Sequence, residues 1–327
     1  MKDAWGREID YMRVSITDRC NLRCRYCMPE SGLEMKCHED ILSYEEMLDI
    51  LSVAVSLGFR HFRVTGGEPL VRRNVVSFLE RLSRIPGVDD LSLTTNGVLL
   101  FDMAKDLKKA GVHRVNISLD TLRPARFAEI TRGGDWRRVW MGLERALEVG
   151  FDPVKINVVA ARGINDDEWE DFARLTLDMP VHVRFIEIMP LGQGESWVDR
   201  FVSAGEVLAR LMRMGEIQPV HVAGGGPARY VRLKGAKGSI GVISAISQHF
   251  CSDCNRMRLT ADGKLSPCLA SGEEVDLLSA LRGGAGPEEL GALFEKAVLI
   301  KPARHTMEPC KKGEGMVSER KMYRLGG

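Results

Sequence analysis

Three cysteines on one short segment are the residues of this chain with the clearest chemistry. Cys20, Cys24 and Cys27 lie in the run CNLRCRYC, with C-x3-C-x2-C spacing, directly after a segment typical of a strand. Thiolates are soft ligands, and three of them on one tight loop can hold one metal centre. A cubic 4Fe-4S cluster ordinarily takes four cysteines, so three ligands leave one iron open for chemistry.

Other uses of this first triplet fit its spacing less well. A zinc knuckle needs a fourth ligand nearby, and only Cys37 or His38 offers one, at an odd spacing. Haem c attachment needs a histidine after the last cysteine, where the chain has Met28. Six of the eight cysteines form two spaced triplets, which indicates metal ligation in a reducing compartment and not a disulfide scaffold. Cys37 and Cys310 fall outside both triplets and are expected to be ordinary thiols.

A second triplet lies near the end of the chain. Cys251, Cys254 and Cys268 have C-x2-C-x13-C spacing within CSDCNRMRLTADGKLSPC. Zinc is a stronger alternative here, because the three cysteines lack only a fourth ligand and His249 is close in sequence. Spacing alone therefore leaves zinc and a second iron-sulfur cluster equally open.

Composition excludes several classes of protein. The chain has 327 residues and a net charge of +1, which argues against a general nucleic-acid or membrane binder. The first ten residues, MKDAWGREID, contain no apolar signal region, and no run approaches about 18 apolar residues. We therefore expect a soluble, cytoplasmic protein.

The elements that must position the first triplet follow a regular rhythm. From residue 11 to about 215, β-rich runs alternate with helical patterns, which predicts six β/α units and a parallel sheet. The strands are expected near 11–16, 60–65, 90–95, 113–119, 153–160 and 182–188, with helices such as 44–56 and 136–148 between them. The predicted fold class is α/β, an incomplete (β/α)6 TIM-like barrel.

After residue 215 this rhythm stops. Residues 219–246 indicate short strands broken by glycines, including the run 224–226, and residues 257–267 indicate a hairpin around Asp262-Gly263. The sequence therefore predicts a barrel region, 1–217, and a C-terminal α+β extension, 218–327, which carries the second cysteine site.

Strand parity predicts what fills the barrel. Successive side chains point to opposite faces, so Met12 and Val14 share one face of the first strand and Arg13 and Ser15 the other. The same split recurs in the next four strands, whereas the sixth, with Arg184 beside Ile186, is ambiguous. Helices must cover the apolar faces, so the polar faces line the interior. Burying that many polar groups is costly unless a large polar ligand fills the lumen.

The chemical motifs fall at the carboxyl ends of strands, where β/α barrels place their active sites. The first cysteine loop follows the first strand, and TGGEP, residues 65–69, follows the second. The two glycines would let a ligand approach the backbone, and Glu68 could bind an ammonium group.

Together, the cysteine loop and TGGEP resemble the radical S-adenosylmethionine (SAM) superfamily. The resemblance implies that SAM binds the open iron and is reduced to a 5′-deoxyadenosyl radical. It assigns the adenine contact to Tyr26 and the methionyl amine to the GGEP element. The implied SAM-binding residues are Tyr26, Gly67, Glu68, Ser118 in NISLD, and Met189 in EIMP.

Nearly the whole chain resembles one branch of that superfamily, the GTP 3′,8-cyclases, through CSDCNRMRLTADGKLSPCL and the terminal Gly-Gly in addition to the first loop. The resemblance implies a second 4Fe-4S cluster on the second triplet, whose open iron accepts the guanine of GTP. The implied substrate-binding residues are Arg13, Arg63, Thr94, Lys155, Arg184, Arg256, Met257 and Arg258. The implied catalytic residues are Arg13, Gly326 and Gly327.

The activity implied by this resemblance is that of a lyase, which converts GTP to (8S)-3′,8-cyclo-7,8-dihydroguanosine 5′-triphosphate at the start of molybdenum cofactor (molybdopterin) biosynthesis. Its partners would be an electron donor of flavodoxin or ferredoxin type and the next enzyme, cyclic pyranopterin monophosphate synthase. A homodimer is left open. Two alternatives remain, a radical SAM peptide-modifying enzyme with an auxiliary cluster and a non-enzymatic zinc module.

Overall fold

The chain folds around one curled sheet, which has twelve strands in the described residues. The structure is a computed structural model, and it describes residues 1–32, 36–191, 197 and 199–307. The strand order across the sheet is β12-β11-β10-β1-β2-β3-β4-β5-β6-β9-β8-β7. The strands are β1 (Tyr11–Ser15), β2 (His61–Thr65), β3 (Asp90–Thr95), β4 (Arg114–Ser118), β5 (Val154–Ala160), β6 (Val181–Glu187), β7 (Ile217–Val220), β8 (Arg229–Leu233), β9 (Ser239–Ile243), β10 (Arg256–Leu259), β11 (Lys264–Ser266) and β12 (Val275–Asp276).

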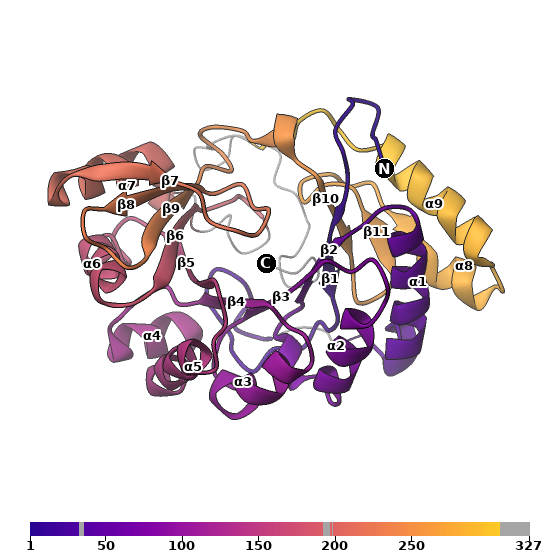
Figure 1. The fold of residues 1–327 in the computed structure, drawn as a ribbon, viewed down its shortest axis with the longest axis horizontal. Helices are drawn as coiled ribbons and strands as arrows, with labels where there is room; N and C mark the ends of the chain where they lie inside the picture. Colours follow the sequence, from indigo (N-terminus) through magenta and orange to yellow (C-terminus); the bar gives the residue numbers. More distant parts are fainter. Residues whose placement is uncertain (33–35, 192–196, 198, 308–327) are drawn as a thin grey trace.

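Helices cover the outer face of this sheet, which forms an open barrel (Figure 1). They are α1 (Tyr44–Ser56), α2 (Val75–Ser83), α3 (Leu100–Lys109), α4 (Pro124–Thr131), α5 (Trp136–Glu148), α6 (Trp169–Asp178), α7 (Ala204–Leu211), α8 (Leu277–Arg282) and α9 (Pro287–Leu299). Short 3-10 turns are η1 (His38–Asp40), η2 (Pro69–Val71), η4 (Met212–Met214) and η5 (Cys251–Asp253). No helix in the described ranges is both long and apolar enough to cross a bilayer.

The predicted barrel units are confirmed. Strands β1 to β6 are parallel neighbours, and each lies within one residue of its expected bounds. The helices expected at 44–56 and 136–148 are α1 and α5. Local chemistry fixes the start of α1: the Ser43 hydroxyl accepts from the Glu46 N–H at 3.1 Å, and the Glu46 carboxylate accepts from the Ser43 N–H at 2.7 Å. This capping box satisfies two backbone donors that the helix leaves free.

The parity argument is also confirmed. Met12 and Val14 are fully buried in the core between sheet and helices, whereas Arg13 lines the interior of the barrel. In the ambiguous sixth strand Arg184 and Ile186 share the inner face, so one apolar side chain lies among the polar ones there. The barrel is therefore apolar outside and polar inside, unlike a closed barrel filled with branched aliphatic side chains.

The C-terminal region joins the barrel sheet at both edges. Strand β9 pairs in parallel with β6, and β10 pairs in parallel with β1. The predicted hairpin after residue 256 is confirmed as β10 and β11, which pair Leu259 with Leu265. The sequence pattern pointed to an extension, and the sheet shows that this extension shares its backbone hydrogen bonds with the barrel.

Candidate functional site

A cavity of about 310 Å³ lies inside the barrel. Its wall includes residues from β1 to β6, from the loops after them and from the C-terminal region. Most residues singled out from the sequence line it: Arg13, Cys20, Cys24, Tyr26, Cys27, Arg63, Gly67, Thr94, Ser118, Arg184, Met189, Cys251, Cys254, Arg256, Arg258 and Cys268.

The two cysteine triplets lie at opposite ends of β1. Cys20 follows the carboxyl end of this strand. Cys254 lies two residues before β10, which runs parallel to β1 with Arg256 opposite Tyr11, the first residue of β1. One cavity therefore has a three-cysteine loop at each end.

Backbone hydrogen bonds shape the first cysteine loop. The N–H of Cys27 donates to the carbonyl of Cys24 at 2.9 Å, which closes a tight turn. The N–H of Arg25 donates to the carbonyl of Ile130 at 2.9 Å and so anchors the loop to α4. At its start, the N–H of Leu22 donates to the Cys20 sulfur at 3.4 Å. The loop is thus built as a rigid sulfur-bearing turn.

Burial makes bare thiolates unfavourable in this loop. It raises the pKa of Cys20 to about 11 and that of Cys27 to about 12, and nearby negative groups add to the effect at Cys27. The pKa of Cys24 is also raised well above its usual value, mainly by burial. Three adjacent buried thiols lose their protons readily only when a metal cation binds the thiolates in their place, so these residues fit an iron-sulfur cluster.

Tyr26, between the second and third cysteines, is held by a buried carboxylate. Its hydroxyl donates to Asp120 at 2.7 Å, and the other oxygen of Asp120 accepts from the N–H of Val159 at 2.8 Å. Burial raises the pKa of Asp120 to about 6. No motif in the sequence gave Asp120 a role. The ring of Tyr26 also contacts Trp197 edge-on, with centroids 5.6 Å apart.

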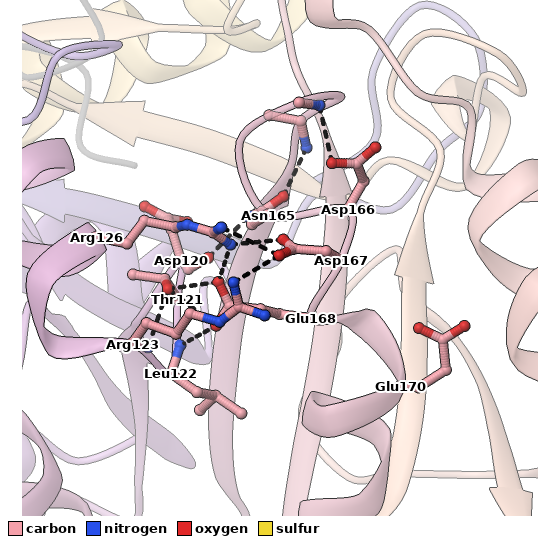
Figure 2. Close-up of polar contacts among 12 residues, drawn as sticks. Asp120, Thr121, Leu122, Arg123, Arg126, Asn165, Asp166, Asp167, Glu168 and Glu170 are labelled. Carbon is pink, nitrogen blue, oxygen red and sulfur yellow. Dashed lines mark hydrogen bonds and ion pairs between the residues drawn. The ribbon is translucent and has the colours of Figure 1, made fainter.

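A polar network behind Asp120 fixes the loop after β4 (Figure 2). The side-chain amide of Asn165 donates to the Asp120 carbonyl at 2.7 Å. Glu168, which is 1 % exposed, accepts from the Thr121 hydroxyl at 2.7 Å and pairs with Arg126. Buried polar groups that are fully satisfied specify one conformation. The orientation of Tyr26 therefore depends on residues after both β4 and β5.

The TGGEP element lines the cavity with Gly66 and Gly67 and also packs against the chain before the cysteine loop. A side chain at Gly67 would overlap the carbonyl oxygen of Arg19, and the N–H of Gly67 donates to the carbonyl of Thr17 at 2.8 Å. The side on which Gly67 would carry a side chain is filled by the segment leading to the cysteine loop, whereas both glycines line the cavity. The expected approach of a ligand to their backbone stays a prediction.

Glu68 is buried and does not line the cavity within the described part of the chain. Its carboxylate accepts from the Thr95 hydroxyl at 2.8 Å and from the Asn96 N–H at 2.6 Å. Burial raises its pKa to about 7. The side chain therefore ties the end of β2 to the end of β3, and its predicted contact with an amine stays a prediction.

Three arginines occupy the same register position on three neighbouring strands. The strand register pairs Arg13 with Arg63 on β2 and with Arg258 on β10. Burial, followed by the charges of Arg258, Arg63 and Arg256, lowers the pKa of Arg13 well below its usual value. Arg13 Nε and Arg63 Nη2 are buried atoms without a hydrogen-bond partner in the described residues. Such a row favours an anionic ligand, which would supply the missing acceptors.

Lys155 and Arg184 differ in their contacts. Arg184 lines the cavity and donates to the side-chain oxygens of Asn157 at 2.8 Å and Asn116 at 2.7 Å. Lys155 lies deeper, is 1 % exposed, and donates to the carbonyl of Ala223 at 2.6 Å. Burial, with help from the charges of Arg184 and other arginines, lowers its pKa to about 6.

A buried lysine accompanies the second triplet. Lys301 donates to the carbonyls of Arg256 at 2.7 Å and Pro267 at 2.6 Å. Burial alone would raise the pKa of Cys254, but the charges of Arg256 and Lys301 lower it to about 6. This thiol is therefore prepared to ligate a metal. A single lysine near the chain end carries no spacing signal, so sequence analysis could not have found it.

Two histidines lie beside the second triplet. The ligand atoms of His249, Cys251 and His305 lie within 4.8 Å of one another, and the two rings are 4.3 Å apart. The zinc alternative required a nitrogen ligand here, and the geometry supplies one. Geometry alone therefore does not separate zinc from a cluster at this end of the cavity.

One expected contact, Met257, points away from the cavity. The Met257 side chain is fully buried in the hydrophobic core, because β10 directs Arg256 and Arg258 toward the cavity and the residue between them away from it. Gly326 and Gly327 lie outside the described residues.

Comparison with known families identifies two matching regions. Residues 14–176 match the radical SAM superfamily, and residues 181–307 match Molybdenum Cofactor Synthesis C. Curated relatives named GTP 3′,8-cyclase match over at least 95% of their length in the two cases that follow. The chain is 51% identical to the one from Desulforamulus reducens over 330 residues, covering 100% of both chains. It is 53% identical to the one from Heliobacterium modesticaldum, covering 94% of this chain and 95% of that relative.

Among solved structures, Streptococcus suis SuiB bound to S-adenosylmethionine has a similar fold. The TM-score is 0.57 at 15% identity, and the match covers 84% of this chain. It covers 63% of SuiB, so this chain corresponds to less than two thirds of that protein. The likeness supports the barrel fold with its C-terminal extension.

Proposed function

Since this chain belongs to the radical SAM superfamily and, within it, to the GTP 3′,8-cyclases, we propose that it is an enzyme that converts GTP to (8S)-3′,8-cyclo-7,8-dihydroguanosine 5′-triphosphate with SAM. This is the first step of molybdenum cofactor biosynthesis. One observation carries the proposal: a single cavity with three cysteines at each end and a row of arginines between them.

The donor sets fit two 4Fe-4S clusters. Cys20, Cys24 and Cys27 would hold the first, and Cys251, Cys254 and Cys268 the second. When bound, the first cluster supplies the electron that cleaves SAM, and the second supplies an open iron for guanine. Family membership favours this pairing over the zinc module.

The end of the cavity that carries Cys20, Cys24 and Cys27 would bind SAM. We assign the adenine to Tyr26, whose ring is fixed by its bond to Asp120. Ser118 and Met189 lie on the same cavity wall and would contact the rest of the cofactor. Gly67 and Glu68 belong to this group as the element that receives the methionyl amine. A fixed pocket wall keeps the reacting groups close and excludes water, which is the main contribution of the protein.

The basic part of the cavity would bind GTP. Arg256 and Arg258 project from β10 beside the second triplet and would hold the purine, with Met257 limited to contacts through its backbone. Arg13 and Arg63 have unpartnered nitrogens for phosphate oxygens. Thr94, Lys155 and Arg184 complete the proposed substrate site.

GTP binding should take up a proton at Lys155. In the free protein its pKa is lowered to about 6, so the amine is neutral at pH 7.5. A nearby triphosphate raises that pKa, so binding above pH 6 requires protonation and affinity should fall as pH rises. Calorimetry in buffers of different ionisation enthalpy should show uptake of about one proton, which Lys155→Met should abolish. Equal proton uptake by this variant would contradict the assignment.

The remaining parts of the proposal concern the chain as a whole. Residues 1–217 would generate the radical, and residues 218–327 would bind the substrate base. The terminal Gly326 and Gly327 would act in cyclisation, as the family resemblance implies. The electron would come from a protein of flavodoxin or ferredoxin type, and cyclic pyranopterin monophosphate synthase would consume the product.

The decisive test is an anaerobic assay of the reconstituted protein. We expect about eight irons per chain and no zinc. With SAM, reductant and GTP, the protein should form 5′-deoxyadenosine and the cyclised nucleotide in equal amounts. A chain lacking Gly326 and Gly327 should keep its iron but cyclise little GTP. SAM cleavage with no GTP consumption would favour the peptide-modifying alternative, which the full-length cyclase relatives otherwise disfavour.

A further inference from the structure

The glycine run at residues 224–226, between β7 and β8, lies at the amino-terminal end of the barrel strands. We define the floor loop as residues Ala223 to Pro227, in the connection between β7 and β8, which reaches toward the middle of the barrel in Figure 1. Pro227 lines the central cavity. A β-carbon added at Gly225 would lie 3.7 Å from the ring of Tyr11, the first residue of β1.

The floor loop also contacts the strands on the far side. A β-carbon at Gly224 would lie 2.5 Å from Nε of Arg114, the first residue of β4. Lys155, near the start of β5, donates to the Ala223 carbonyl at 2.6 Å. A β-carbon at Gly226 would lie 4.0 Å from Nη1 of Arg184 on β6. The loop therefore spans the amino-terminal opening, from β1 across to β4, β5 and β6.

Two features of the loop require glycine. Gly224 has φ +105° and Gly225 has φ +40°, conformations that side chains disfavour. At Gly224 the Arg114 guanidinium also occupies the space of a side chain. Arg114 is 5 % exposed, pairs with Asp90, and keeps its Nε without a partner in the described residues. The loop therefore leaves no room for a side chain between Gly224 and the buried Arg114.

The charge around the floor loop is unbalanced. Arg63 and Arg184 form no ion pair with an acidic side chain in the described part of the chain, and Lys155 forms none either. The floor loop itself contains no acidic residue. Arginines without counterions beside a cavity form a subsite for an anion, and Lys155 adds its charge once a nearby phosphate raises its pKa.

We propose that the floor loop ends the phosphate subsite and makes the pocket select the length of the phosphate chain. This inference rests on the proposed function, because it takes a guanine nucleotide as the ligand. With the base held beside the second triplet, the chain of phosphates extends toward Arg184, Lys155 and the floor loop. A triphosphate reaches these cations, whereas a monophosphate stops short of them.

The test compares glycine variants at two sites. Gly226→Asp places a carboxylate near Arg184, and Gly224→Ala forces the loop away from Arg114. Gly235→Asp is the matched control, because Gly235 is exposed, has φ +80°, and would bring its β-carbon within 4 Å of no described atom. Calorimetry on the reconstituted protein measures the Kd values of GTP and GMP, and iron content and melting temperature check folding.

We expect the ratio of the GMP Kd to the GTP Kd to fall by about tenfold in Gly226→Asp, and to fall in Gly224→Ala, because the terminal phosphate loses charged contacts. Gly235→Asp should leave the ratio unchanged. An unchanged ratio in a folded Gly226→Asp protein, or an equal loss of both affinities, would overturn the inference. The cyclisation assay of the wild-type protein separates failure of the floor-loop inference from failure of the proposed function. If the wild type cyclises GTP but the Kd ratio is unchanged in the folded variants, only the floor-loop inference is wrong.

Discussion

Replacing Cys24 by alanine should remove about four irons per chain and abolish reductive cleavage of SAM. Cys24 lies in the tight turn that also carries Cys27, and the pKa of both thiols is raised by burial. No other cysteine side chain of the described residues lies in this turn to replace the lost sulfur. Iron analysis and chromatography of 5′-deoxyadenosine measure the two effects.

Substitution at the other end of the cavity gives the matched comparison. Cys268→Ala should also lose about four irons but still form some 5′-deoxyadenosine, while GTP cyclisation stops. Cys37, exposed and outside both triplets, serves as the control, and Cys37→Ala should behave as the wild type. If Cys268→Ala kept all its iron and cyclised GTP, the second cluster would be wrongly assigned.

Replacing Arg13 by alanine should weaken GTP binding and stabilise the ligand-free protein at the same time. Arg13 lies between Arg63 and Arg258 in the strand register, so its removal relieves repulsion among buried cations. It also removes a charged hydrogen bond to phosphate, which costs about 1.5 to 3 kcal/mol, or roughly 10- to 150-fold in Kd. Calorimetry measures the loss of GTP affinity, and thermal unfolding with and without GTP measures the gain in stability of the ligand-free protein.

Two controls sharpen this prediction. Arg13→Lys keeps the charge but loses the planar fork of the guanidinium, so its GTP affinity should fall between wild type and Arg13→Ala. Arg84, an exposed arginine that forms an ion pair with Glu80, should tolerate alanine without effect on GTP binding. An Arg13→Ala protein with wild-type GTP affinity would refute the role of the arginine row.

Local patterns were sufficient to predict the barrel and most of the cavity wall. The two-residue period of a strand is a property of single segments, so it placed Arg13 and Arg63 inside from the sequence alone. It could not show that these two stand level with Arg258, because register between strands depends on distant pairing.

The residues that sequence analysis missed act through contacts between segments. Lys301 reaches the second triplet from a position just after α9, and Asp120 acquires its role only when Tyr26 folds against it. Gly67 lines the cavity, but the motif did not reveal that its backbone also packs against the carbonyl of Arg19. Spacing within a motif identifies a loop, but not which neighbour fills the space beside it.

The pairing of β1 with β10 has a consequence for biosynthesis. The side chain of Asn255 bonds to that of Asp10 across 245 residues of sequence. At a translation rate of about 5 to 20 residues per second, β10 is synthesised roughly 12 to 50 s after β1. During that interval one edge of β1 is an open template for wrong strands. The barrel wall that carries both sulfur sites is therefore completed only after β10 has been synthesised.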